Sequence, residues 1–223
     1  MGGPERKVAL YDQFARVGKA LSNGMRLQLL DLIAQGERTV DSLARTAGLG
    51  LTTTSAHLQV LKRAGLVHTR RDGTRVYYSL AGDDVAMLYA SIRDVAQQHI
   101  ADTEHARLAY LGDETEAVSR DELMNRVREG TVIVLDVRPR EEYKAGHIPG
   151  AISIPLEELS EHLSGLPSDR EIVSYCRGSY CVLAHDAVRL LRGEGRVAAR
   201  LADGMLEWRL SGQPVSTDAR ITA

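Results

Sequence analysis

One short stretch, residues 174–182, constrains the fold of this chain most, because it holds both cysteines and joins two kinds of pattern. The residues before Cys176 are apolar and β-rich, as in a buried strand, and apolar residues after Cys181 recur at helical spacing. A loop between a strand end and a helix start gathers backbone N–H groups that stabilise an anion. We therefore expect Cys176 to be a nucleophilic thiolate whose pKa is lower than that of a free cysteine.

Length and composition predict two globular domains in the cytoplasm. The chain has 223 residues, of which 43% are hydrophobic and 26% charged, as is ordinary for soluble proteins. It has no apolar run long enough for a membrane span, and residues 1–7 lack the apolar core of a signal peptide. Two cysteines are too few for a disulfide framework, so reactive thiols are expected.

Charge divides the chain into halves of opposite sign. Residues 1–110 hold 14 Lys and Arg against 11 Asp and Glu, whereas residues 111–223 hold 14 against 19. Within the first half, the window 57–75 contains one acidic residue, Asp72, and a cluster of basic residues: Lys62, Arg63, Arg70, Arg71 and Arg75. Such a local excess of positive charge is typical of a surface that binds phosphate groups.

The first half predicts a winged helix-turn-helix. Apolar periodicity indicates helices over residues 8–21, 25–33, 40–47 and 51–64, and the last of these should bury Leu51, Leu58 and Leu61. Two β-rich segments then flank Asp72-Gly73, a strong hairpin signal, and the hairpin tip is cationic. A single long helix over residues 83–111 follows, and its partial apolar stripe suggests a dimer seam.

Three segments carry a resemblance to the arsenic-repressor (ArsR) family of bacterial transcription factors. They read ALSNGMRLQLL at 20–30, TSAHLQVLKRAGLV at 54–67 and GTRVYY at 73–78. The resemblance implies a homodimer that binds a palindromic operator in double-stranded DNA. It places the DNA contacts on two sets of residues, in the fourth helix and in the wing: Thr52, Thr53, Ser55, His57 and Gln59, with Arg71 and Arg75.

The sequence departs from the metal-binding members of that family. Their usual site needs cysteines on the helix before the recognition helix, and here residues 40–47 contain no thiol. The carboxylates and histidines on the later helix, His99, Asp102, Glu104 and His105, do not match the spacing of the family's second site. We expect neither a bound metal nor a cofactor.

The second half alternates strands with helices, which predicts an α/β domain with a mainly parallel sheet. Ligands of such sheets bind beyond the carboxyl ends of the strands, where Cys176 lies. The acidic segment GDETE at 112–116 should be a linker between two domains, residues 1–111 and residues 117–218.

The segment LDVRPREEYKAGHIPGA at 135–151, the strand-end cysteine and the residues around Gly204 and Trp208 together resemble the rhodanese family. The resemblance implies that Cys176 takes a sulfane sulfur from a donor and holds it as a persulfide. The loop that would bind this sulfur comprises Arg177, Gly178, Ser179, Tyr180 and Cys181. We interpret the acidic, basic and imidazole side chains of the earlier segment as structural rather than chemical: Asp136, Arg138, Glu142 and His147.

The loop differs from the commonest rhodanese pattern at two positions. Ser179 stands where glycine is usual, and Cys181 stands where an arginine that orients anionic donors often lies. Cys181 is either a packed helix residue or a second thiol that attacks an oxidised or persulfidated Cys176. We therefore assign catalytic roles to Cys176, Arg177 and Cys181.

These patterns favour a DNA-binding transcriptional repressor that senses reactive sulfur species, persulfide or polysulfide, through Cys176. One alternative is a rhodanese-type sulfurtransferase that works through a Cys176 persulfide and whose winged helix only regulates its own operon. A second alternative is a repressor that responds to metalloids.

Overall fold

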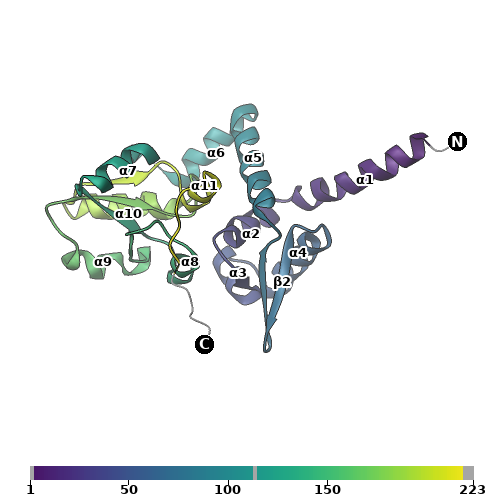
Figure 1. Ribbon diagram of the computed structural model, residues 1–223, viewed down its shortest axis with the longest axis horizontal. Coiled ribbons are helices and arrows are strands. Elements are labelled where there is room, and N and C mark those ends of the chain that lie inside the picture. The colour runs from purple at the N-terminus through teal and green to yellow at the C-terminus, as the bar shows by residue number, and fades with distance from the viewer. Residues whose placement is uncertain (1–2, 113–114, 218–223) are drawn as a thin grey trace. The chain divides into compact units, whose positions relative to one another are not determined.

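The computed structural model describes residues 3–112 and 115–217, and the chain folds into two compact units, Met1–Ile92 and Arg93–Ala223 (Figure 1). Each unit is described by itself. This division lies earlier in the chain than the predicted acidic linker. Residues 113 and 114 of that linker, and residue 218 at the end of the predicted second domain, lie outside the described residues.

The first unit contains four helices before its wing: α1 (Gly3–Leu21), α2 (Gly24–Ala34), α3 (Val40–Ala47) and α4 (Leu51–Arg63). Asn23 begins α2 by accepting a hydrogen bond from the Arg26 amide at 3.2 Å. Gly48 ends α3 in the left-handed conformation with φ 65°, which permits the tight turn into α4. These four predicted helices are therefore confirmed.

The prediction that α4 buries three leucines is wrong for one of them. Leu58 and Leu61 are fully buried, but Leu51 is 53% exposed, because it is the first residue of the helix and lies at the surface. Thr54 is buried in its place, and its hydroxyl donates to the carbonyl of Gly50 at 3.0 Å. This hydrogen bond satisfies the polar atom and lets a threonine enter the core.

The wing is an antiparallel hairpin of β2 (Val67–Asp72) and β3 (Arg75–Leu80), and the short strand β1 (Arg38–Thr39) pairs with β3. Asp72 pairs with Arg75 across the turn, and Gly73 has φ 58°. This conformation is the reason that Asp-Gly is favoured at the tip.

The long helix predicted over residues 83–111 is two helices, α5 (Asp83–His99) and α6 (Ala101–Leu111). Ile100 between them is extended, with φ −111° and ψ 107°. The Thr103 hydroxyl donates to the Ala96 carbonyl at 3.1 Å, and acidic residues in the first turn of α6 favour a helix start.

The second unit contains a five-stranded sheet in which all paired strands are parallel, in the order β4-β8-β7-β5-β6. Its strands are β4 (Ala117–Val118), β5 (Val132–Asp136), β6 (Ile152–Ser153), β7 (Glu171–Tyr175) and β8 (Ala198–Leu201). Its helices after the linker are α7 (Arg120–Arg128), α8 (Arg140–Ala145), α9 (Leu159–His162), α10 (Val182–Gly193) and α11 (Met205–Leu210). The predicted α/β architecture is confirmed.

The sheet separates two apolar cores. On one face, Leu159 of α9 and Val188 and Leu191 of α10 pack against β5 and β7. On the other face, Leu123 of α7 and Trp208 of α11 pack against the same strands. This packing fixes the carboxyl end of the central strand β7, which leads into Cys176.

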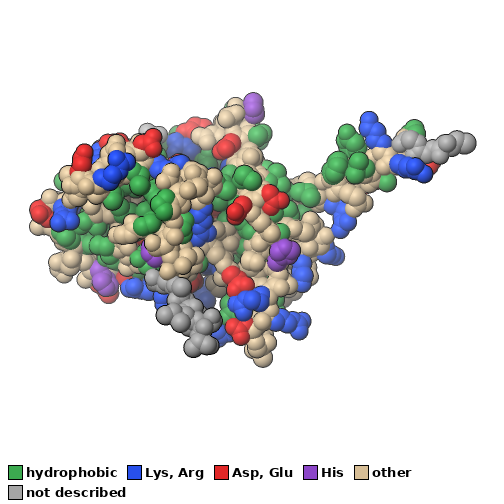
Figure 2. Space-filling view, in the orientation of Figure 1, with side chains coloured by type: hydrophobic (Ala, Val, Ile, Leu, Met, Phe, Trp, Pro, Cys, Tyr) green, Lys and Arg blue, Asp and Glu red, His purple; other side chains and the backbone are tan. Residues whose placement is uncertain are grey.

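Hydrophobic side chains also lie exposed along α1, as Figure 2 shows on the helix that carries the N-terminus. They include Val8, Leu10, Tyr11 and Phe14, each more than half exposed.

Among the described helices, none combines the length and the apolar character needed to cross a membrane.

Candidate functional site

Buried polar groups at the ends of the strands stabilise the residue that precedes the loop, which begins at Cys176. The Tyr175 hydroxyl, at the end of β7, donates to Asp136 Oδ2 at 2.5 Å and accepts from the Ile148 amide at 3.1 Å. Asp136 also forms an ion pair of 2.6 Å with Arg138, and both side chains are fully buried. These contacts agree with the structural role predicted for Asp136 and Arg138, since both side chains are fully buried and their partners lie at the end of the sheet.

Cys176 lies directly after β7 and is 2% exposed. Its thiol donates to the Cys181 carbonyl at 3.2 Å, while backbone groups of Ala184 and Gly178 lie within hydrogen-bonding reach of its sulfur. Burial and the neighbouring Cys181 raise the pKa of Cys176 well above its usual value, although the backbone hydrogen bonds act in the opposite direction. The expectation of a lowered pKa for this cysteine is therefore wrong, because desolvation outweighs the loop amides.

Cys181 is the N-cap residue directly before α10, and its pKa shifts in the opposite direction. The hydrogen bond with Cys176 lowers the pKa of Cys181, burial opposes this effect, and the positive charge of Arg177 lowers the pKa further. The helix N-terminus and the nearby guanidinium thus stabilise a thiolate at Cys181 rather than at Cys176. Both thiols are free.

Arg177 forms an ion pair with Glu142. Its Nε lies 3.0 Å from both carboxylate oxygens of Glu142, and Nη2 donates to Oε1 at 2.8 Å. The Glu142 side chain is 1% exposed. This bidentate pair holds the loop in place, and it commits the only arginine of the loop to a carboxylate instead of to an incoming anion.

The second candidate site lies on the first unit, where α4 meets the wing. An open cleft is lined by residues of α3, α4 and β3 that include Thr52, Ser55 and Arg75. Thr53, His57 and Arg71 do not line this cleft. Gln59 does not line the cleft either. Its side-chain amide donates to the Tyr78 hydroxyl at 3.1 Å.

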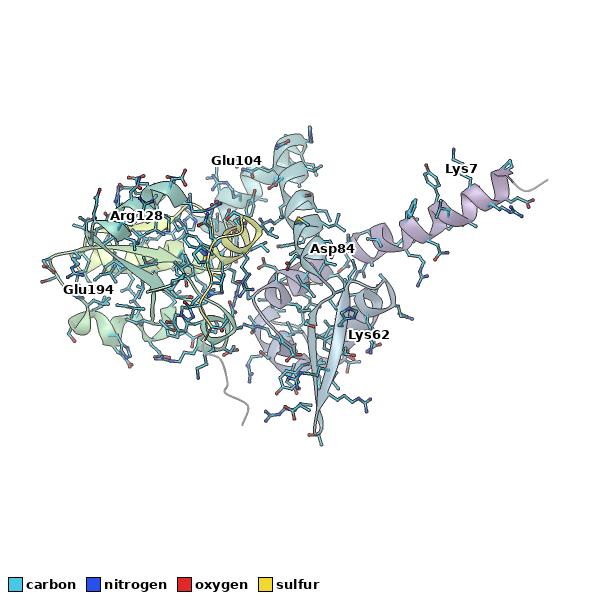
Figure 3. The ribbon with its side chains drawn as sticks, in the orientation of Figure 1. Lys7, Lys62, Asp84, Glu104, Arg128 and Glu194 are labelled. Atoms are coloured by element: carbon cyan, nitrogen blue, oxygen red, sulfur yellow. The ribbon has the colours of Figure 1, made fainter. Side chains whose placement is uncertain are left out.

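The basic residues near the wing differ in how their charge is compensated. Arg70 forms an ion pair of 2.6 Å with Glu37 and stacks over Tyr77. Lys62 projects from α4 and donates to Thr69 of β2 at 2.9 Å (Figure 3). Arg71 and Arg75 are exposed, and within the described residues neither forms an ion pair. These two side chains are the ones most available to a phosphate.

Comparison with known proteins identifies the families to which the two parts of the chain are similar. A family model for the rhodanese-like domain matches residues 119–211, and one for bacterial regulatory proteins of the arsR family matches residues 23–69. The HTH-type transcriptional regulator Rv0324 of Mycobacterium tuberculosis is 57% identical over 220 residues, which cover 99% of this chain and 97% of the relative. The chain belongs to the ArsR family of transcriptional regulators and carries a C-terminal rhodanese domain.

Two further relatives each match less than half of this regulator. A sulfurtransferase of Allochromatium vinosum is 32% identical over 84 residues, or 38% of this chain and 78% of the relative. A solution structure described as the homodimeric winged helix-turn-helix DNA-binding domain of a Mycobacterium bovis protein is 59% identical. It covers 45% of this chain and 93% of its own, with a TM-score of 0.42.

The sequence patterns did not indicate one acidic residue that contacts the regulator's cysteine loop. Glu207 of α11 accepts hydrogen bonds from the Gly204 amide at 3.0 Å and from the Ser179 hydroxyl at 3.4 Å. Its carboxylate oxygens lie 3.2 Å from the position that a Cβ on Gly178 would occupy. The stretch around Gly204 and Trp208 marks the family, but nothing in its pattern indicates that Glu207 turns toward the loop.

His185 of α10 is a second residue that the sequence did not single out. It is buried, and its Nδ1 lies 3.1 Å from the Thr115 hydroxyl. Burial and three nearby arginines, first Arg200 and then Arg189 and Arg107, lower its pKa to about 4. The imidazole is therefore neutral near pH 7.

Within the part of the regulator that the structure describes, no group of three or more histidine, cysteine or acidic residues is arranged to hold a metal ion. The residues His99, Asp102, Glu104 and His105 form no such group. Glu104 instead pairs with Arg107 at 2.7 Å.

Proposed function

We propose that this regulator is a homodimeric repressor that binds palindromic operator DNA and senses reactive sulfur species through Cys176. The observation that carries the proposal is the pair Cys176 and Cys181 at the carboxyl end of β7, in a family of transcription regulators. The thiol of Cys181, whose pKa is lowered, lies beside the buried thiol of Cys176, so the pair supplies a second nucleophile next to the first.

The first step is transfer of one sulfur atom. The Cys176 sulfur attacks the outer sulfur of a persulfide R–S–SH and loses its proton in the same step. A new S–S bond forms at Cys176, the S–S bond of the donor breaks, and the departing donor sulfur takes up the Cys176 proton and leaves as the thiol RSH. The loop amides around the sulfur then hold the Cys176 persulfide.

Cys181 also allows a second step. Its thiolate attacks the inner sulfur of the Cys176 persulfide, hydrosulfide leaves, and a Cys176–Cys181 disulfide remains. The persulfide itself is the oxidant, so no other oxidant is needed. After this step the sulfur has left as hydrosulfide without passing to an acceptor molecule, and both cysteines are held in a disulfide. This outcome suits a sensor better than an enzyme with multiple turnovers.

Two features support the DNA-binding part of the proposal. The cleft of Thr52 and Ser55 beside Arg75 matches the pairing of a recognition helix with a cationic wing. The exposed apolar side chains of α1 supply a surface that a second copy of the chain would cover. The residues Thr53, His57, Gln59 and Arg71 remain predicted DNA contacts.

The runner-up function is a sulfurtransferase, which the resemblance to the Allochromatium vinosum enzyme favours. Buried Cys176 and committed Arg177 oppose rapid turnover of an anionic donor. In the sulfurtransferase function, Cys176 would serve catalysis alone, and the winged helix would act only on its own operon.

A gel-shift titration of the full-length protein separates these functions. We expect polysulfide to release a fluorescent operator fragment, while arsenite and zinc leave it bound. Release by arsenite or zinc alone would indicate a metalloid- or metal-responsive repressor. Multiple turnovers of thiocyanate formation from cyanide, without any change in DNA binding, would indicate the enzyme.

A further inference from the structure

The cysteine loop is held in two different ways along its length. Its first half is fixed by backbone contacts to α11, since the Met205 and Leu206 amides donate to the carbonyls of Cys176 and Arg177 at 2.9 Å each. A Cβ on Gly204 would lie only 2.3 Å from the Gly178 nitrogen. The two backbones are in direct contact, so the first half of the loop has no room to move toward α11.

The second half of the loop is held by side chains of α5. The Tyr180 hydroxyl donates to Oε1 of Gln97, and the Arg93 guanidinium lies 5.3 Å from the centre of the Tyr180 ring. Arg93 and Gln97 are one helical turn apart, so they present one face to Tyr180. Both residues belong to the second unit.

Arg93 is also joined to the loop through Glu207. Its Nη2 lies 2.5 Å from Glu207 Oε1, and the two side chains are 13% and 17% exposed. The same carboxylate oxygen accepts the Ser179 hydroxyl at 3.4 Å. Removing one partner of an ion pair with so little solvent exposure costs more than breaking a surface pair, because the other charge is left buried and unpaired.

Cys176 can react only if this arrangement opens. At 2% exposure its sulfur is out of reach of a donor molecule, and an added sulfur atom would need space in a closely packed loop. The backbone contacts to α11 leave no room on one side. The side-chain contacts of Ser179 and Tyr180 are the part of the loop that can give way.

We propose that Arg93 and Gln97 form a latch, which holds the loop closed over the Cys176 thiol and is released when the cysteine is modified. The latch lies on α5, whose residues Val85, Ala86 and Tyr89 are buried in the first unit. Release therefore changes the contacts of the helix that begins in the DNA-binding unit. This inference rests on the proposed function and adds how the signal leaves the loop.

Thermodynamic linkage makes the latch testable. If modification of Cys176 releases the latch, then removing the latch must make Cys176 easier to modify. The variant Arg93→Ala/Gln97→Ala removes it, and Tyr180→Phe removes only the hydroxyl donor. Arg126→Ala is the matched control, since Arg126 is an arginine of the same unit that pairs with Glu122 and Glu171 on α7 and β7.

The first measurement is the rate at which iodoacetamide alkylates Cys176 in the full-length protein. Trypsin cleaves after Arg177, so the two cysteines fall on separate peptides that mass spectrometry distinguishes. We expect labelling about fivefold faster in the double variant, a smaller increase in Tyr180→Phe, and the wild-type rate in Arg126→Ala. Equal rates in wild type and both latch variants would overturn the latch.

The second measurement is operator affinity before and after polysulfide treatment. Wild type and Arg126→Ala should lose about tenfold on loading, whereas the double variant should take up sulfur and show a ratio near 1. A full tenfold loss in the double variant would also overturn the latch. If polysulfide adds no sulfur to wild type, the proposed function fails, but faster alkylation of the latch variants would still support the latch.

Discussion

Cys176 and Cys181 have opposite pKa shifts because their surroundings differ in kind. Burial at the strand end dominates at Cys176, while at Cys181 the hydrogen bond with Cys176 outweighs the opposing effect of burial, and the charge of Arg177 lowers the pKa further. A strand-end cysteine before a helix is readable in the sequence. How strongly this cysteine is desolvated cannot be read from the sequence, because it depends on side chains that are distant in the chain.

We predict that Cys176→Ser remains a folded protein and no longer takes up sulfane sulfur. The hydroxyl replaces a buried thiol of similar size, so the loop contacts persist, but the hydroxyl does not form a persulfide. Intact mass after polysulfide treatment should show added sulfur on wild type only. Sulfur on the Cys181 peptide of this variant would show that Cys181 is the first nucleophile.

A second residue-scale prediction concerns His185, whose pKa is lowered to about 4 in the folded chain from about 6.5 when exposed. Between these values the unfolded chain binds the proton and the folded chain does not, so stability falls as pH decreases. The loss for this residue is at most about 3 kcal/mol. Thermal unfolding at pH 7.5 and pH 5 should show a smaller decrease of Tm in His185→Gln than in wild type; an equal decrease would argue against this titration.

At the scale of elements, the wing should bind DNA through its uncompensated arginines. Arg75→Ala should weaken binding to operator and random DNA alike and reduce the salt dependence by about one charge. Arg70→Ala is the matched control, because the charge of Arg70 is already paired with Glu37, and it should have the smaller effect. Fluorescence anisotropy at several salt concentrations measures both; a larger effect of Arg70→Ala would contradict this assignment.

The sequence predicted most elements because their signals are local. Asp72-Gly73 forms the predicted tip of the hairpin, and the side chains of Asn23 and Ser119 each accept an amide hydrogen bond at the start of a helix. The break at Ile100 was missed because neither glycine nor proline marks it. It depends on a threonine side chain that bonds back to Ala96, a weak signal in a sequence otherwise typical of one helix.

At the scale of the whole molecule, the sequence located the cysteine loop and the family but not the residues that close the loop. Glu207 contacts Arg93 across 114 positions of sequence, and Tyr180 contacts Gln97 across 83. Such pairs have no local pattern. They emerge only when the sheet brings α11 and the cysteine loop together and the end of α5 packs within the same unit.

The most direct test of the account is the operator affinity of the full-length protein in three states: reduced, loaded with polysulfide, and reduced again with dithiothreitol. The account predicts that loading weakens binding about tenfold, that reduction restores it, and that Cys176→Ser shows neither change. Wild-type protein that carries added sulfur by mass and binds the operator with unchanged affinity would contradict it, as would an equal loss of affinity in Cys176→Ser.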